Sequence, residues 1–84
     1  MADELHVFMI ALLNTEENEP DLEYRLHLAG CDDALRGHRA GCILLEFHRN
    51  GSCLDELIGI AIDDLEDVGY TPRLAQFLPN NKDL

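Results

Sequence analysis

Apolar residues are arranged along the chain in segments of two different periods. Residues Leu5–Leu13, LHVFMIALL, form a continuous apolar run rich in residues that favour strands. The run has the length of one buried strand and is short for a helix, so it predicts a central strand. In Cys42–Arg49, Ile43, Leu45 and Phe47 occupy alternate positions, which is the period of a strand with one buried face.

Two other segments have helical spacing. Pro20–Asp21 favours a helix start and Gly30 favours a left-handed helix end, which predicts a helix over Asp21–Ala29. For a second helix, Ser52 is the predicted N-cap and Gly69 the predicted end. The apolar residues of this second helix recur at helical spacing and are Leu54, Leu57, Ile58, Ala61, Ile62, Leu65 and Val68.

Two short strands complete the pattern. Residues Ala34–Arg36 precede a glycine-bounded turn and predict a hairpin with Cys42–Arg49. Residues Thr71–Leu78 predict a last edge strand, in which Pro72 is tolerated near the start. The resulting order is satisfied by an α+β fold of the ferredoxin-like βαββαβ class, in which two helices cover one face of an antiparallel sheet.

The length of the chain limits what it can enclose. With 84 residues, 46% of them apolar, we expect one compact domain over residues 1–84 with loose ends at 1–4 and 79–84. A domain of this size has little room for a large enclosed active site. No basic leader precedes an apolar core, and no apolar run approaches the roughly 20 residues that span a bilayer.

Negative charge is the strongest feature of the composition. The chain has 17 Asp and Glu against 6 Lys and Arg, which gives a net charge of −11. This charge repels nucleic acid and anionic membranes and favours basic partners, although an acidic surface also simply keeps a small protein in solution. Three cysteines cannot all pair within one chain, so we expect a reducing, cytoplasmic location, which is the host cytosol if the protein is phage-encoded.

Histidine precedes cysteine in three short stretches, HLAGC at 27–31, HRAGC at 38–42 and HRNGSC at 48–53. Zinc sites usually place two ligands two to four residues apart on a tight knuckle, twice over. Here the pairs lie at junctions between different predicted elements. We therefore expect no metal and no cofactor, and we interpret the three cysteines as small apolar fillers at the ends of elements.

The sequence lacks the motifs that mark common enzymes. It contains no G-x-S-x-G elbow, no phosphate-binding loop and no H-E-x-x-H. Neither DD at 32–33 nor DDLED at 63–67 has the alternating acids and the glycine of a calcium-binding loop. We therefore predict a protein without enzymatic activity.

Three motifs resemble a known module. They are GCDDA at 30–34, G-x-x-x-L-x-F-x-R at 41–49 and S-x-x-D-E-x-I-x-x-A-I-x-D at 52–64. Through them, residues 22–78 resemble a small bacterial ferredoxin-like module that often precedes a helix-turn-helix in antitoxin-like or regulator-like proteins. Because the DNA-reading helices of that family do not follow in this chain, the resemblance implies the fold and not DNA binding.

The outer face of the second predicted helix is the main candidate for a binding surface. At 100° per residue, Glu56, Asp63 and Asp67 lie opposite the apolar stripe, and Ile60 lies among them. An exposed apolar residue ringed by carboxylates is typical of an interface anchor with a charged rim, although isolated apolar residues are also ordinary on surfaces. With the two acids at the positions of the family's paired acids, the predicted partner-binding residues are Glu56, Ile60, Asp63, Asp64, Asp67, Asp32 and Asp33.

Positive charge gathers around the predicted hairpin. The residues concerned are Arg36, His38, Arg39, His48 and Arg49. This basic end can bind an anion or the acidic end of another copy, and it can equally be a solvated turn. An exposed edge strand can also pair two copies into a homodimer, although the basic residues near the hairpin can protect that edge.

Acidic charge without catalytic motifs favours a small inhibitor that occupies a basic nucleic-acid-binding surface of another protein. Carboxylates along a helix can imitate phosphate charge, and the affinity of such a surface is mainly electrostatic. In composition the chain is similar to phage anti-CRISPR proteins and other DNA mimics. The alternative is a regulatory or dimerising module of an antitoxin-like or transcription-regulator system whose DNA-binding part is missing or lies on another chain.

Overall fold

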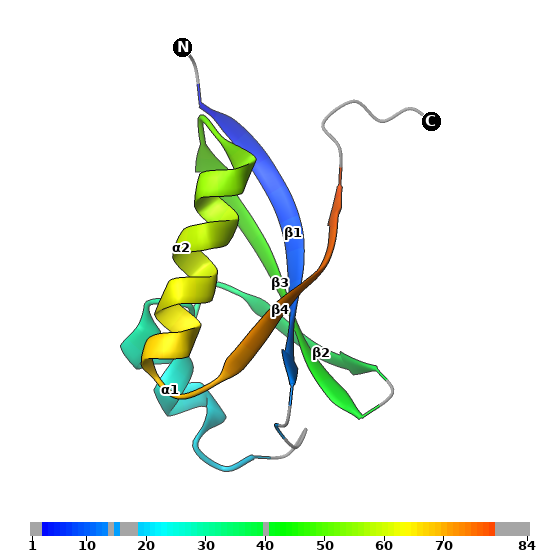
Figure 1. Cartoon of the computed structure of the whole chain (residues 1–84), viewed down its shortest axis with the longest axis vertical. Helices are drawn as coiled ribbons and strands as arrows, with labels where there is room; N and C mark the ends of the chain where they lie inside the picture. Colours follow the sequence, from blue (N-terminus) through cyan, green and yellow to red (C-terminus); the bar gives the residue numbers. More distant parts are fainter. Residues whose placement is uncertain (1–2, 14, 16–18, 40, 79–84) are drawn as a thin grey trace.

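The computed structural model is a small α+β domain in which a four-stranded antiparallel sheet carries two helices (Figure 1). It describes residues 3–13, 15, 19–39 and 41–78. The elements in chain order are β1 (Glu4–Leu13), α1 (Leu22–Ala29), β2 (Leu35–Arg39), β3 (Cys42–Gly51), α2 (Leu54–Asp67) and β4 (Thr71–Leu78). The kinds of element predicted from the apolar periods, and their order, are confirmed.

The strands lie in the order β2-β3-β1-β4, and every neighbouring pair is antiparallel. β1 is central, as its continuous apolar run predicts, and β4 lies at one edge, also as predicted. β2 and β3 form the predicted hairpin, in which Arg39 pairs with Cys42 and Gly41 has a φ of 80°. The tight turn therefore uses a glycine where a left-handed residue is required.

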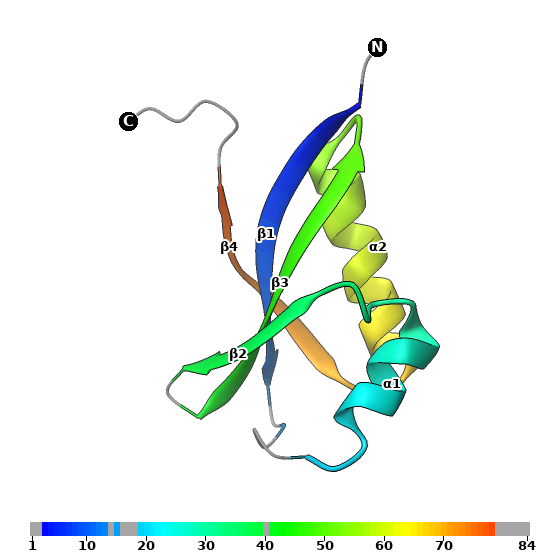
Figure 2. The ribbon, with the colours of Figure 1, turned by 180° about the vertical axis from the view of Figure 1, so that it is seen from behind.

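Both helices lie on the same side of the sheet, as Figures 1 and 2 show from opposite directions. Alternate residues of β1 and β3 point towards the helices and are fully buried, and Phe8 stacks on Phe47 with ring centroids 5.1 Å apart. The predicted apolar stripe of α2 is confirmed, since Ile58, Ala61 and Leu65 are buried in the same core. Among the described residues, no helix is both long and apolar enough to cross a bilayer.

Both helices end in the same way. The backbone N–H of Cys31 donates to the Leu26 carbonyl after α1, and the N–H of Tyr70 donates to the Leu65 carbonyl after α2. In each case the preceding glycine, Gly30 or Gly69, is left-handed. These are Schellman ends, so the two helix ends predicted from glycine are confirmed.

A cluster around Tyr70 fixes α1 against the end of α2. The Tyr70 hydroxyl donates to the Glu19 carboxylate at 2.8 Å, and the guanidinium of Arg25 lies 5.2 Å from the centre of the ring. Burial, with a smaller contribution from the hydrogen bond to Glu19, raises the pKa of Tyr70 to about 12. The hydroxyl therefore stays protonated and remains a donor throughout the neutral range.

The structure corrects the predicted start of the second helix. Ser52 is not its N-cap, because Cys53 occupies that position without a side-chain capping bond. The reason is that β3 continues to Gly51, which pairs with Glu4 and accepts a hydrogen bond from the buried His6. A Cβ at Gly51 would lie 3.0 Å from the Leu57 side chain, so glycine there lets α2 begin close against the strand.

Three other predicted boundaries move by a few residues. α1 starts at Leu22, one residue after the predicted start, and β2 covers Leu35–Arg39 where 34–36 was expected. The expected loose end at residues 1–4 is wrong for Glu4, which begins β1. Residues 79–84, the other expected loose end, lie outside the described residues.

Candidate functional site

The outer surface of α2 carries the acids that the helical period places there. Glu56, Asp63 and Asp67 are exposed, and Asp64 is half-buried. Ile60 lies among them with 52% of its surface exposed, which confirms its predicted exposure. The structure therefore brings five of the seven predicted partner-binding residues onto one helix.

The carboxylates of α2 have no opposite charges beside them. The helix contains six Asp and Glu residues and no Lys or Arg. In the described part of the chain, none of these six forms an ion pair or a side-chain hydrogen bond. They are therefore available to bind a cationic surface.

The distribution of acids along α2 is unfavourable for helix stability at one end. Asp55 and Glu56 in the first turn complement the helix dipole, whereas Glu66 and Asp67 in the last turn oppose it, and no basic residue is present there. Asp63 and Asp67 are also a like-charge pair at i and i+4. Acids that cost stability are retained at an exposed surface, which favours a role in binding.

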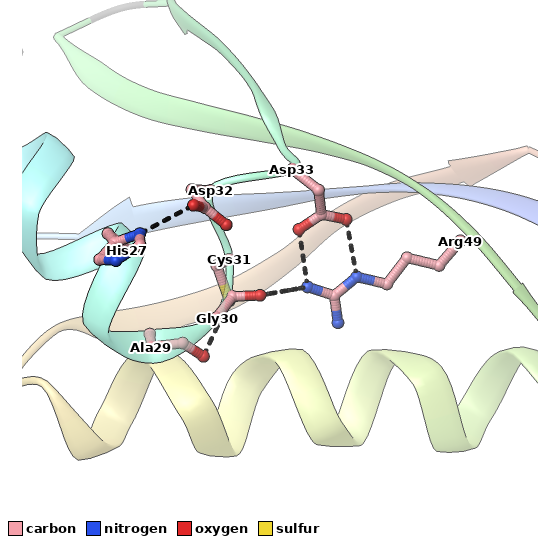
Figure 3. Close-up of polar contacts among 7 residues, drawn as sticks. All are labelled: His27, Ala29, Gly30, Cys31, Asp32, Asp33 and Arg49. Carbon is pink, nitrogen blue, oxygen red and sulfur yellow. Dashed lines mark hydrogen bonds and ion pairs between the residues drawn. The ribbon is translucent and has the colours of Figure 1, made fainter.

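The other two predicted partner-binding residues lie in the turn after α1, and both are engaged within the chain (Figure 3). Asp32 is hydrogen-bonded to Nδ1 of His27 at 2.9 Å. Asp33 accepts two hydrogen bonds from Arg49, one from Nε at 3.1 Å and one from Nη2 at 3.0 Å. The paired acids therefore hold the turn, unlike the unpaired carboxylates of α2.

Arg49 joins β3 to this turn through more than the Asp33 carboxylate. Its Nη2 also donates to the Gly30 carbonyl at 3.3 Å and lies 3.8 Å from Sγ of the fully buried Cys31 (Figure 3). The hydrogen bond from Arg49 lowers the pKa of Asp33, and the same contact raises the pKa of Arg49. Burial raises the pKa of the Cys31 thiol, which therefore stays protonated and unreactive.

We expect Arg49→Met to destabilise the protein by about 1–2 kcal/mol at pH 7, because Asp33 and the Gly30 carbonyl lose a charged donor. The folded-state pKa of Asp33 lies below its ordinary value of 3.8. The stabilisation from ionised Asp33 is therefore complete above that value and is lost as the pH falls through the folded-state pKa. Urea unfolding from pH 7 to pH 3 should show the difference between variant and wild type shrinking below about pH 4.

Arg36→Met is the matched control for this prediction. Arg36 contacts Glu23 at 3.3 Å, but both side chains are exposed. Its loss should change the free energy of unfolding by less than about 0.5 kcal/mol. An Arg49→Met effect that stays constant from pH 7 to pH 3 would contradict the assignment of the Asp33 contact.

The basic residues around the hairpin are largely paired with acids. Besides Arg49, Arg36 contacts Glu23, and Nε2 of His48 lies 2.6 Å from the Glu46 carboxylate. The side chain of Arg39 lies outside the described part of the structure. The described contacts therefore favour a structural role for most of this positive charge.

The cysteines do not come together. Cys31 is buried as the filler interpretation predicts, Cys42 is half-buried, and Cys53 is exposed, so that interpretation is wrong for Cys53. Among the described residues, no group of three or more His, Cys, Asp or Glu side chains could hold a metal ion.

One hollow of about 360 Å³ opens beside α1 and β2, and its lining residues are Glu23, Leu26, His27, Asp32, Ala34 and Arg36. Its charged groups already pair with one another, Glu23 with Arg36 and His27 with Asp32. The hollow therefore offers a ligand fewer unsatisfied groups than the outer face of α2 does.

No family model, no curated protein and no solved structure matches the chain. A function therefore has to be inferred from the chain's own surface. Arg49 was not predicted to contact Asp33. From the sequence it was only one of the basic residues of the hairpin and the last residue of one motif. No local signal could have linked it to Asp33, because the two are 16 residues apart and meet only through the packing of the turn on β3.

Proposed function

We propose that this protein is a non-enzymatic inhibitor that binds the basic nucleic-acid-binding surface of another protein, as DNA mimics such as phage anti-CRISPR proteins do. The observation that carries the proposal is the row of unpaired carboxylates on α2. The surface that binds the partner, hereafter the acidic face, consists of Glu56, Ile60, Asp63, Asp64 and Asp67.

The charge density of α2 is close to that of a nucleic-acid strand. Its 14 residues carry six carboxylates. At 1.5 Å per residue the helix is about 21 Å long, so there is one negative charge per about 3.5 Å. One strand of B-DNA carries one per about 3.4 Å. Four of the six carboxylates lie on the acidic face, whereas Asp55 and Glu66 lie on another side of the helix. A groove whose lysines and arginines follow a phosphate backbone would therefore meet about two thirds of this charge directly.

Ile60 adds an apolar contact to the charged residues of the acidic face. It is 52% exposed at the middle of the acidic face. An apolar residue inside a polar rim becomes desolvated on binding and slows dissociation, whereas the surrounding charges mainly speed association. The acidic face thus combines electrostatic attraction with a central contact that can fix the register.

The proposal is tested by competition for a captured partner. The immobilised protein is incubated with bacterial lysate at low salt, bound proteins are identified, and capture is repeated with an excess of duplex DNA. We expect a captured nucleic-acid-binding protein whose retention falls at least about tenfold with DNA and also falls steeply between 50 and 200 mM salt. Retention that DNA leaves unchanged would contradict the proposal.

A regulatory or dimerising module of an antitoxin-like system is the second candidate. It is favoured by the contact of Asp33 with Arg49, because residues from two of the three resembling motifs meet there. In this case the same capture experiment should recover a toxin or a DNA-binding chain that DNA does not displace. We also propose the ferredoxin-like class for the fold, supported by the element order and by the strand order β2-β3-β1-β4.

A further inference from the structure

We propose that the face of the sheet turned away from the helices, hereafter the open face, packs against the same face of a second copy of the chain. The open face consists of the alternate residues of β1 from Leu5 to Leu13 and of their partners on the neighbouring strands, among them Leu35 of β2, Leu44 and Glu46 of β3 and Arg73 of β4. This inference concerns a surface on the opposite side of the sheet from α2 and goes beyond the proposed function.

The strand register gives the open face an apolar row along β1, which Leu44 extends onto β3 and which polar residues of the neighbouring strands border. Met9 on β1 is opposite Glu46 on β3, which is opposite Leu35 on β2. One step along, Ala11 is opposite Leu44, which is opposite Gly37. Residues opposite one another in a sheet point to the same side, so Ala11 and Leu44 are apolar neighbours on this face, whereas Glu46 lies between Met9 and Leu35.

No helix among the described residues covers this surface, and in both ribbon views the helices lie on the other side of the sheet (Figures 1 and 2). Leu5 is 53% exposed and Leu35 is 61% exposed. Scattered apolar residues are ordinary on a monomer, but a row of apolar residues along a central strand that no described helix covers favours an interaction surface.

The open face also has a hollow that can receive a side chain. It measures about 210 Å³ and lies over Gly37, and its lining combines the apolar Met9, Leu35 and Leu44 with the polar side chains of Arg36, His38 and Glu46. A Cβ at Gly37 would meet nothing within 4 Å. In a two-fold symmetric dimer each copy presents both the hollow and the exposed Leu35. The contact between the leucine of one copy and the hollow of the other is therefore made twice.

The small charge of the open face favours a second copy of this chain over other partners. Among the described strand residues, Glu46 is the one acid that alternates onto the open face, and its carboxylate lies 2.6 Å from Nε2 of His48. Arg73 of β4, opposite Ala11, adds a positive charge there. The open face is therefore close to neutral on a chain of net charge −11, and two copies can join without bringing the carboxylates of α2 together.

The area suits a small dimer. Strands about 4.8 Å apart with about 3.3 Å per residue give the four-stranded sheet about 500 Å² of projected surface. The accessible area of a side-chain-covered face is larger than its projection, and a standard interface buries about 800 Å² per partner. The dimer would leave both acidic faces on its outside.

The test is the mass in solution of the wild type and of two glutamate variants with equal charge. Leu35→Glu changes the open face, whereas Leu28→Glu changes α1, and the two leucines are similarly exposed, at 61% and 59%. We expect wild type and Leu28→Glu to sediment at twice 9.5 kDa. Leu35→Glu should raise the dissociation constant of the dimer at least about tenfold, because an unpaired carboxylate would be buried in both copies.

Two further measurements separate this interface from other contacts. Met9→Lys lies on the central strand β1, so it should also break the dimer, whereas pairing through a sheet edge would survive it. Raising the salt from 50 to 500 mM should strengthen the dimer, because salt screens the repulsion between two acidic chains. The same change should weaken the complex with the nucleic-acid-binding protein. A wild type that stays monomeric at 200 μM in 500 mM salt, or a dimer that both open-face variants leave intact, would overturn the proposal.

Discussion

Changing Glu56, Asp63 and Asp67 together to lysine should weaken binding to the captured nucleic-acid-binding protein by at least about 100-fold. Each reversal replaces an attraction by a repulsion, and exposed pairs are worth up to about 1 kcal/mol each. Three such changes amount to about 3 kcal/mol, which corresponds to roughly a hundredfold change in affinity. Calorimetry or biolayer interferometry at 50 and 200 mM salt would measure the loss and the reduced salt dependence.

The fold of this triple variant should be about as stable as that of the wild type, because the expected effects on α2 oppose one another. Asp67→Lys places a positive charge in the last turn, where it complements the helix dipole, whereas Glu56→Lys loses the favourable acid of the first turn. Positions 63 and 67 remain a like-charge pair, now of two lysines, so the repulsion between them is unchanged. Thermal unfolding followed by circular dichroism should therefore show a Tm close to that of the wild type. Lost binding with a retained Tm would assign the effect to the surface of α2 and not to unfolding.

A second triple variant controls for net charge. Asp3, Asp21 and Glu23 are exposed acids outside α2, and changing them to lysine alters the net charge by the same amount. We expect this variant to weaken binding by less than about fivefold, through long-range attraction alone. Equal losses in the two triple variants would show that bulk charge, and not the acidic face, determines binding.

Changing Phe8 to alanine should remove about 3–5 kcal/mol of stability, the usual cost of deleting a buried phenyl ring. Phe8 is fully buried and stacks on Phe47 with the ring planes at 11°. A small domain is commonly stable by only about 5 kcal/mol, so a large fraction of the variant should be unfolded at 37 °C. Urea unfolding followed by circular dichroism gives the free energy directly.

Two comparisons make the Phe8 result interpretable. Phe8→Leu keeps most of the apolar volume and should cost less than about 2 kcal/mol. Leu28→Ala removes an exposed leucine of α1, which is 59% accessible, and should change stability by less than about 0.5 kcal/mol. If Phe8→Ala cost no more than Leu28→Ala, the assigned core between the sheet and the helices would be wrong.

Local periodicity was sufficient to predict most of the fold. The run from Leu5 to Leu13, the alternation in β3 and the stripe along α2 each follow from burying one face of a regular element, which depends only on spacing in the sequence. The ends at Gly30 and Gly69 were predictable because a left-handed residue favours glycine wherever it occurs. The exposure of Ile60 followed from the same helical period.

The prediction was wrong where a distant part of the chain competes with a local preference. Ser52 has the chemistry of an N-cap, but β3 extends to Gly51 because that residue pairs with Glu4 at the other end of the sheet. The helix therefore begins later, at Leu54. The backbone hydrogen bonds between β3 and β1 outweighed one side-chain capping bond. The residues near Ser52 give no indication of this strand pairing, so it could not be predicted locally.

The sequence by itself determined which elements form and which side of α2 is acidic, because both follow from contacts or angles between residues a few positions apart. Only the tertiary structure decided which charges remain unpaired. Asp33 is paired with Arg49 from a separate strand, whereas no cation of the described residues pairs with the carboxylates of α2. These outcomes depend on how the turn, the sheet and the helix pack together. The same packing places both described helices on one face of the sheet, which no local pattern specifies.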